Sequence, residues 1–388
     1  MGTRGVPPRY GGFETFAAEL GGRLVGRGHE VAVYCRDTPV IPSVSEGPGR
    51  AGREMATDAR RPPAQVPRDA RNDIAVWNGI HRIVLPAIRH KYFETVSHTL
   101  LSSLDALRRN FDVILLCNAA NAFVLPFLRA ARIPVAINVD GIERRRRKWN
   151  VFGRVVYAIG ETFSALFANR VVADAEVIAG YYRKRYGIEP VMIPYGAEFP
   201  EEDDSDVLQR LRLERDRYIL YVSRFEPENN PLEVVEAYER SGVALPLVMV
   251  GDALYAHDLK RELLRHESDR IRFPGALYGP DYRTLQRNAA IYVQATEVGG
   301  THPAMIEAMG SGGCVVAHDT PENREVGGDA VGYFRLRPHE SLSGILREWA
   351  GTPNLRDTWR ERARRRAEAR YGWETVTSAY ERLFWDIR

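Results

Sequence analysis

Apolar residues fall into two alternating patterns along this chain. Short unbroken runs such as VAVYC and VILLC predict buried strands, and the segments between them repeat an apolar residue every three or four positions, as amphipathic helices do. Strands that alternate with helices in this way are typical of an α/β fold with parallel sheets. The expected strands cover residues 30–35, 81–85, 112–117, 135–138, 170–173, 191–193, 218–222, 247–250, 271–273, 291–294 and 314–316.

The strands form two series, which predict two domains. A chain of 388 residues exceeds what one hydrophobic core usually supports. One face of the last helix is apolar, so that helix must pack on another element. The carboxyl ends of the strands of both domains are expected to face a shared cleft. The expected units are a first α/β domain over residues 1–197, an acidic linker over 198–216, a second α/β domain over 217–372 and the last helix over 373–388.

Two segments depart from this regular pattern. Residues 2–12 form a loop rich in glycine and proline that leads into a helix, yet only Met1 stands where a preceding strand is expected. Either translation starts upstream of Met1, or the first strand is missing from this domain. Residues 38–75 are rich in Pro, Gly and Arg and poor in large apolar residues, so they predict a disordered insertion.

Composition and charge disfavour several classes of function. The 54 Lys and Arg residues are nearly matched by 51 Asp and Glu residues, and a net charge of +3 gives no argument for nucleic-acid binding. The three cysteines lie in apolar runs without paired spacing, which indicates buried strand residues in a reducing compartment. No apolar run approaches the ~18 residues of a membrane span and no secretory signal is present, so we expect a cytoplasmic protein.

The stretch from Glu297 to Glu325 carries the strongest chemical signal. Gly299 and Gly300 precede Pro303, which suits the first turn of a helix because it lacks an N–H group. The unpaired amides and the partial positive charge of such a helix N-terminus bind phosphate, and Glu307 lies one turn further on. The alternative is an ordinary α/β helix that follows a glycine-rich loop.

Charged residues follow two of the expected strands. Arg224 suits bidentate phosphate binding, or it forms a surface ion pair with Glu226 or Glu228 instead. Asp140 can orient sugar hydroxyls or take a proton, or it serves only the geometry of an Asp-Gly turn. Both residues would lie at the cleft, because ligands of open α/β sheets bind beyond the carboxyl ends of the strands.

Three further signals concern binding partners. Gly11 and Gly12 precede the first helix and form either a ligand-binding loop or a tight turn. The basic run from Arg144 to Lys148 is either a solvated loop or a contact with an acceptor diphosphate or an anionic membrane. No His, Cys or Asp spacing suits a metal, and the absence of a Walker loop and a nucleophile elbow disfavours the P-loop and hydrolase classes.

Several segments together resemble the rhamnosyltransferase-like branch of glycosyltransferase family 4. They occur in the family's order, and the similarity covers nearly the whole chain except about residues 38–75, so their joint occurrence is specific. The segments are GTRGVPPRYGGFETFAAEL, RHKYFETVSHTLLSS, NVDGIERRRRKW, ILYVSRFEPENNPLEVVEAY and VGGTHPAMIEAMGSGGCVVAHDTPENREV.

The resemblance implies a GT-B architecture, in which two Rossmann-like domains face an interdomain cleft and a C-terminal helix crosses back to the first domain. It implies a retaining, metal-independent transferase without a cofactor, which moves a deoxyhexose. The expected reaction takes rhamnose from dTDP-rhamnose to a saccharide or lipid-linked acceptor in cell-surface glycan synthesis. The second domain would bind the nucleotide-sugar donor and the first domain the acceptor. Such a protein is cytoplasmic or peripheral at the inner face of the membrane.

The resemblance also implies roles for single residues. Arg224 would contact the donor diphosphate, Glu307 the ribose, and Asp140 the transferred sugar, at a position where many family 4 enzymes carry a histidine. The amides around Gly300 to Pro303 would hold phosphate. The expected site residues are Asp140 and Glu297 for catalysis and, for donor binding, Gly11, Gly12, Arg224, Asn230, Gly300, Thr301, His302 and Glu307, with no metal ligand.

Two departures from the family's pattern leave other functions open. Asn229 and Asn230 stand where the broader family has a lysine. Gly299 stands where the first of two spaced glutamates is expected, and Glu297 is the nearest acid. One alternative is therefore a non-catalytic GT-B partner of another transferase, and another is a nucleotide-sugar isomerase of the same architecture.

Overall fold

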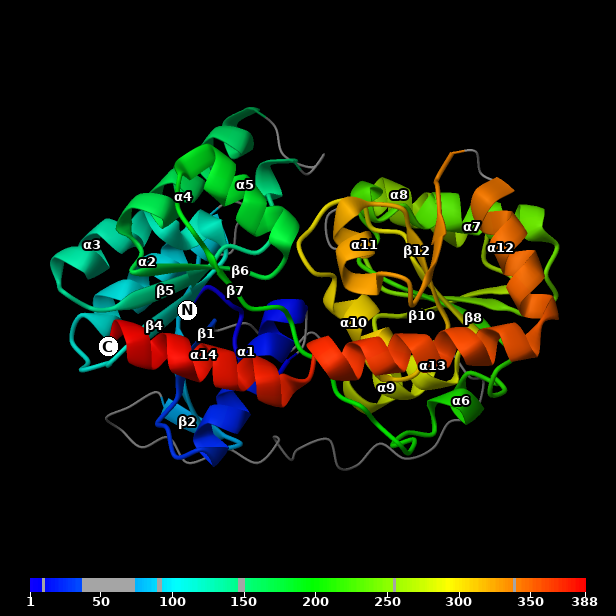
Figure 1. Ribbon diagram of the computed structural model, residues 1–388, viewed down its shortest axis with the longest axis horizontal. Coiled ribbons are helices and arrows are strands. Elements are labelled where there is room, and N and C mark those ends of the chain that lie inside the picture. Colours follow the sequence, from blue (N-terminus) through cyan, green and yellow to red (C-terminus); the bar gives the residue numbers. More distant parts are fainter. Residues whose placement is uncertain (9–10, 37–73, 89–92, 146–150, 254–255, 338–339) are drawn as a thin grey trace, which may run out of the picture.

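The computed structural model describes residues 1–8, 11–36, 74–88, 93–145, 151–253, 256–337 and 340–388. It contains two α/β domains side by side, which two C-terminal helices join along one edge (Figure 1). Nearly all of the predicted insertion at 38–75 lies outside the described residues, and so do the last three residues of the basic run, Arg146, Arg147 and Lys148.

The first domain holds two sheets that flank the opening residues of the chain. Met1 O accepts a hydrogen bond from Cys117 N at 2.9 Å, and Arg4 O accepts one from Arg36 N at 3.0 Å. The opening segment therefore lies between the edge strands of the two sheets, and the expectation of a strand before it stays a prediction. The strand order is β1 (Ala32–Arg36), β3 (Ile80–Leu85), β2 (Ile74–Trp77) in one sheet, and β4 (Ile114–Cys117), β5 (Val135–Asn138), β6 (Arg170–Ala173), β7 (Val191–Met192) in the other.

Helices cover both faces of the first-domain sheets. The helix α1 lies on the same side as the last helix of the chain, and the helices α2 to α5 form a layer on the opposite side (Figure 1). The strands β4 to β7 are all parallel, so each crossover helix between them falls on one face. The elements are α1 (Gly12–Gly26), α2 (Phe93–Ala106), η1 (Ala119–Val124), α3 (Leu125–Ala130), η2 (Glu143–Arg145), α4 (Val151–Phe167) and α5 (Glu176–Tyr186).

The second domain is built on one six-stranded parallel sheet with buried central strands. Its strand order is β10 (Ile271–Gly275), β9 (Leu247–Val250), β8 (Ile219–Val222), β11 (Ile291–Gln294), β12 (Val315–His318), β13 (Gly332–Phe334). Its helices are α6 (Val207–Arg210), η3 (Pro227–Asn229), α7 (Pro231–Ser241), α8 (His257–Leu264), α9 (Gly279–Asn288), α10 (Pro303–Gly310), α11 (Pro321–Gly327) and α12 (Glu340–Gly351).

The last two helices tie the domains together. Ala197 N donates to Tyr371 O at 2.6 Å, so the two places where the chain passes between the domains lie side by side. Beyond this point the last helix packs on α1, where Arg27 donates to Glu381 at 2.7 Å. The predicted GT-B architecture, with a helix that crosses back to the first domain, is confirmed. The two helices are α13 (Pro353–Arg370) and α14 (Trp373–Ile387).

Candidate functional site

The glycine-containing loops of the two domains lie against each other. A Cβ atom added to Gly12, at the start of α1, would lie 3.2 Å from Cγ of Pro303, at the start of α10. A Cβ atom added to Gly141 would lie 2.7 Å from the carbonyl carbon of Gly299. Backbone from the first domain thus touches backbone from the second, and this approach requires glycine at position 141. Gly11 differs, because its added Cβ atom would meet only the Glu14 carboxylate, at 3.5 Å.

Asp174, at the carboxyl end of β6, reaches across to the N-terminus of α10. Its Oδ2 atom accepts hydrogen bonds from the backbone N of Thr301 at 3.0 Å and from the Thr301 hydroxyl at 2.9 Å. A Cβ atom added to Gly300 would lie 2.1 Å from Asp174 Oδ1, so Gly300 makes room for this carboxyl group. One of the backbone amides that the sequence predicts to bind phosphate, that of Thr301, therefore donates to a carboxyl group of the protein instead.

The cleft brings two carboxyl groups together from neighbouring strands. Asp140 follows β5 and Asp174 follows β6, and these strands pair in parallel. Burial is the largest cause that raises the pKa of Asp174, and the negative charge of Asp140 also raises it. The bonds from Thr301 lower it, and the result of all these effects is a pKa of about 7. Asp174 Oδ1 is buried without a hydrogen-bond partner in the described part of the chain. Asp174 therefore holds a proton more tightly than an exposed aspartate does.

Arg224 lies just beyond β8, on the second-domain side of the cleft. Its side chain is 42% exposed, and its guanidinium lies 3.6 Å from the Glu226 carboxylate. An exposed pair at this distance contributes little to stability. The loops after β8 and β11 share one sheet edge, because these strands pair in parallel. Arg224 thus lies on the same edge as the loop that leads into α10, and its contact with phosphate stays a prediction.

The side chain of Asn230 is buried and bonds to the backbone of the protein. Asn230 adopts a φ of 55° and donates from Nδ2 to Ala295 O at 2.8 Å. This bond joins the loop after β8 to the end of β11. The backbone N of Glu297 donates to Glu228 O at 3.0 Å, which fastens the same two loops a second time. The proposed ligand contacts of Asn230 and Glu297 stay predictions.

Glu307 and His302 are held by neighbouring side chains. Glu307 accepts a hydrogen bond from Tyr195 at 3.2 Å and one from Tyr282 at 2.6 Å, and burial raises its pKa. His302 Nδ1 lies 2.7 Å from Asn323 Oδ1, which fixes the orientation of its ring. A ribose at Glu307 would therefore compete with two tyrosine hydroxyls.

The sequence did not indicate Asp174, Tyr195, Tyr282 or Asn323. One signal could have pointed to Asp174, because it follows the strand next to the one that ends before Asp140. The tyrosines carry no such signal, since Tyr195 lies 112 residues from the carboxylate that it contacts.

Two family models match the chain. The model described as "Glycosyltransferase Family 4" matches residues 10–198, and the one described as "Glycosyl transferases group 1" matches residues 204–366. The chain belongs to the GT-B glycosyltransferases of family 4. This glycosyltransferase is also similar to a GDP-Man:Man(3)GlcNAc(2)-PP-Dol alpha-1,2-mannosyltransferase of Neurospora crassa, with 24% identity over 53% of the chain. The chain spans 43% of the length of that relative.

Solved structures of low sequence identity share the fold of this glycosyltransferase. Sucrose-phosphate synthase from Thermosynechococcus elongatus matches with a TM-score of 0.76 and 17% identity, over 97% of this chain and 93% of that one. A glycosyltransferase from Rickettsia africae matches with a TM-score of 0.68 and 14% identity, over 99% and 97%. HepE of Anabaena, in complex with UDP-glucose, matches with a TM-score of 0.67 and 17% identity, over 79% and 86%.

Proposed function

We propose that this glycosyltransferase moves a deoxyhexose, rhamnose carried by dTDP, to a saccharide or lipid-linked acceptor. The transfer retains the anomeric configuration and uses neither a metal nor another cofactor. Membership of family 4 supports a sugar transfer. The segments that resemble the rhamnosyltransferase-like branch support the choice of sugar, and cell-surface glycan synthesis is the process to which such a reaction belongs.

The observation that carries the proposal is the Asp174 carboxyl group at the N-terminus of α10. Thr301 offers this group both a backbone N–H and a hydroxyl. A donor phosphate presents the same kind of oxygen acceptor, and it binds helix N-termini for the same electrostatic reason. In the proposed donor complex, a phosphate group replaces Asp174 at Thr301, and the two domains move apart far enough to admit it.

The charges of the cleft orient the proposed donor. The negative charge of Asp140 repels a diphosphate, whereas Arg224 and the amides of α10 attract one. The diphosphate therefore binds on the second-domain side, and the sugar points toward Asp140. A carboxylate there accepts hydrogen bonds from sugar hydroxyls.

The proposed reaction breaks the bond between the anomeric carbon and the donor phosphate oxygen. Negative charge grows on the departing diphosphate, where Arg224 and the N-terminus of α10 stabilise it. The acceptor hydroxyl attacks from the face that the diphosphate leaves, and the leaving phosphate oxygen takes the hydroxyl proton. No protein base is needed for this step.

Calorimetric titration with dTDP, UDP and dTDP-rhamnose tests the proposal. We expect dTDP to bind more tightly than UDP, and dTDP-rhamnose to be consumed only when an acceptor saccharide is present. Absence of heat with every nucleotide diphosphate would overturn the catalytic proposal and favour a non-catalytic partner. Conversion of the donor sugar without any acceptor would instead identify an isomerase.

A further inference from the structure

The helix α2 carries its polar side chains inward and its apolar side chains outward. Its buried residues are His98, Thr99, Ser102, Ser103 and Ala106. Its exposed large apolar residues, at helical spacing, are Phe93, Val96, Leu100, Leu101 and Leu104. An amphipathic helix on a water-facing surface shows the opposite arrangement.

Specific hydrogen bonds hold α2 in this orientation. The His98 ring donates from Nε2 to Cys35 O at 3.0 Å, and burial lowers its pKa to about 4, so the ring is neutral. The Thr99 hydroxyl donates to Asn121 Oδ1 at 2.7 Å. These bonds hold the inward side of α2, although His98 Nδ1 is buried without a hydrogen-bond partner in the described part of the chain. A rotation of the helix that buried the leucines would break them.

The helix α4 shows the same inversion. Its most buried positions are glycine or polar, while Phe163 and Phe167 are half-buried against the core. Gly160 packs so closely that an added Cβ atom would lie 2.3 Å from Ala119 O. The buried residues on this side are Gly153, Gly160, Glu161 and Ser164. The exposed apolar residues are Val151, Val155, Val156, Ile159 and Leu166, and Val151 is 77% exposed.

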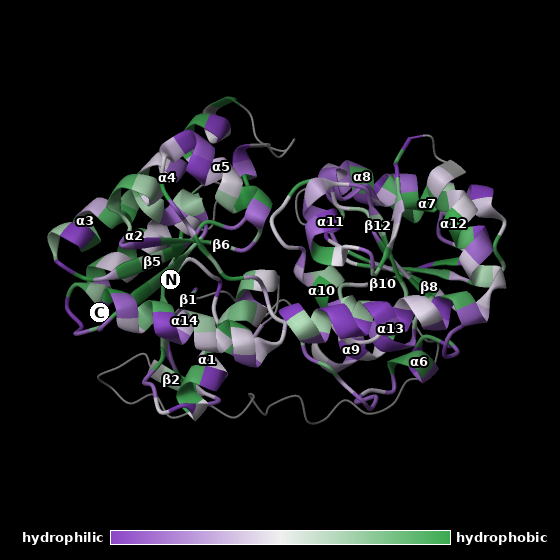
Figure 2. Ribbon diagram, in the orientation of Figure 1, coloured by the Kyte–Doolittle hydropathy of each residue, from purple (hydrophilic) through white to green (hydrophobic). Residues whose placement is uncertain are grey.

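The two apolar stripes belong to one layer of the molecule. Both helices pack on η1, α2 through Thr99 and Asn121 and α4 through Gly160 and Ala119, and Phe127 of α3 is also exposed. Twelve of the eighteen exposed large apolar side chains in the described part of the chain lie on α2, α3, α4 or at Leu107. Figure 2 shows hydrophobic residues interspersed with hydrophilic ones along α2, α3 and α4. Such a concentration of exposed apolar side chains marks an interaction surface.

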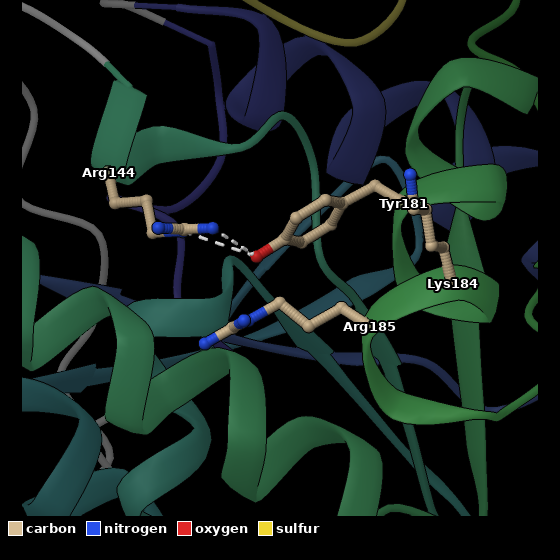
Figure 3. Close-up of a pocket in the computed structure, with 4 residues that line it drawn as sticks. All are labelled: Arg144, Tyr181, Lys184 and Arg185. Carbon is tan, nitrogen blue, oxygen red and sulfur yellow. Dashed lines mark hydrogen bonds between the residues drawn. The ribbon is translucent and has the colours of Figure 1, made fainter.

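Cations border this apolar surface, whereas its acidic side chains are paired. Arg144, Lys184 and Arg185 line a pocket of about 420 Å³ beside Tyr181, whose hydroxyl accepts from Arg144 at 2.7 Å (Figure 3). Further exposed cations on or next to the same helices are Arg108, Arg129, Arg132 and Arg154. The acids form ion pairs with arginines, and Arg144 of the pocket is one of these arginines. The pairs are Glu94 with Arg36, Asp105 with Arg109, Glu161 with Arg144 and Glu176 with Arg183.

We propose that the outer face of α2, α3 and α4, with the cations of α5 and Arg144 at its border, lies on the surface of an anionic lipid membrane. Apolar side chains enter the boundary between headgroups and acyl chains, and the basic border faces lipid phosphates. The pocket beside Tyr181 suits one such phosphate. No described helix is long and apolar enough to cross a membrane.

A second copy of the chain fits this surface less well than lipid does. A two-fold contact would place the same basic border against itself. Like charges then repel, while an anionic lipid surface is complementary. The proposal does not depend on the identity of the sugar donor.

Co-sedimentation with vesicles tests the proposal. The probes are vesicles of phosphatidylcholine alone and of phosphatidylcholine mixed with phosphatidylglycerol. We expect the wild-type protein to bind the mixed vesicles, and the double variant L100Q/L104Q to bind them at least about five-fold less, since two apolar side chains no longer enter the membrane. The variant L264Q, at an exposed leucine of α8, is the matched control and should bind like the wild type.

A second pair of variants separates charge from apolar contact. The double variant K184S/R185S should lose the preference for phosphatidylglycerol, and its residual binding should resemble that of the wild type on neutral vesicles. Circular dichroism and thermal unfolding, measured on each variant, should match the wild type and show that the protein is folded. Equal vesicle binding by the wild type and L100Q/L104Q would overturn the proposal. It would also be overturned if the wild type sediments as a dimer that L100Q/L104Q converts to a monomer.

Discussion

The two walls of the cleft have the same architecture and opposite chemistry. In both domains, the functional side chains follow the carboxyl ends of parallel strands. The first domain places carboxyl groups there, at Asp140 and Asp174, and the second places a guanidinium at Arg224 and the amides of α10. A ligand that fits between them has an anionic end and a hydroxyl-bearing end, as a nucleotide sugar does.

The largest effect on stability is expected where the backbones of the two domains touch, at Gly141 and Gly299. In G141A, the added Cβ atom would meet the backbone of Gly299 at 2.7 Å, so the domains must shift. We expect a loss of about 1–3 kcal/mol in the free energy of unfolding and a larger radius of gyration in small-angle scattering. The control is G22A in α1, where no atom lies within 4 Å of the added Cβ, and which should be neutral or stabilising. Equal stability of G141A and wild type would mean that the walls do not touch.

The next effect concerns the basic wall. R224A should weaken dTDP binding by about 1.5–3 kcal/mol, or about 10- to 100-fold, because a charge-assisted bond to phosphate is lost. Calorimetry measures this directly. The matched variant E226Q removes the ion-pair partner and should leave dTDP affinity unchanged or slightly stronger. If R224A binds dTDP like the wild type, Arg224 does not contact phosphate and only pairs with Glu226.

The acidic wall should give a pH dependence. The pKa of Asp174 is about 7 in the folded protein and near 3.8 when the chain is unfolded, so the folded state binds the proton more tightly. The stability that this proton contributes is complete below about pH 4 and is lost as the pH rises through about 7. We expect the free energy of unfolding of the wild type, relative to D174N, to fall between about pH 4 and 7 in denaturant titrations. A constant difference would show that the Asp174 pKa is not raised.

The smallest expected effect is the difference in stability between substitutions at Gly11 and at Gly12. G11A should change stability and dTDP affinity by less than about 0.5 kcal/mol, because its Cβ atom has room and its φ of −173° is ordinary extended backbone. G12A should cost more, because its Cβ atom would lie 3.2 Å from Pro303 of the opposite wall. Thermal unfolding and calorimetry of both variants measure the difference, and a larger loss for G11A would reverse this assignment.

The sequence predicted the fold where local pattern decides it. The strand β5 was predicted with the bounds Val135–Asn138 that the structure has, because a short apolar run that ends in Asn138 before an Asp-Gly turn admits few other structures. The strands β2 and β13 were not predicted. Both are short, and β2 follows the biased segment. β2 pairs with the next strand, β3, and β13 pairs with β12 at the edge of its sheet, so each depends on its partner more than on its own pattern.

Two features could not be predicted from the sequence. One is the contacts between residues far apart in the chain, and the other is which side of a helix faces the core. The contact of Asp174 with Thr301 joins residues 127 apart, so no local pattern indicates it. Periodicity predicted a helix near α2, but the spacing of its leucines is the same whether they face the core or the outside. Only the contacts of His98 and Thr99 decide that orientation.

Proton release on dTDP binding tests the central claim most directly. A phosphate that replaces Asp174 at Thr301 frees the carboxyl group from burial, so its pKa falls toward the ordinary value and it loses its proton. Calorimetry at about pH 6, in two buffers of different ionisation enthalpy, counts the protons released. The account predicts that the wild type releases a large fraction of one proton more than D174N does. Equal release from the two proteins would contradict it.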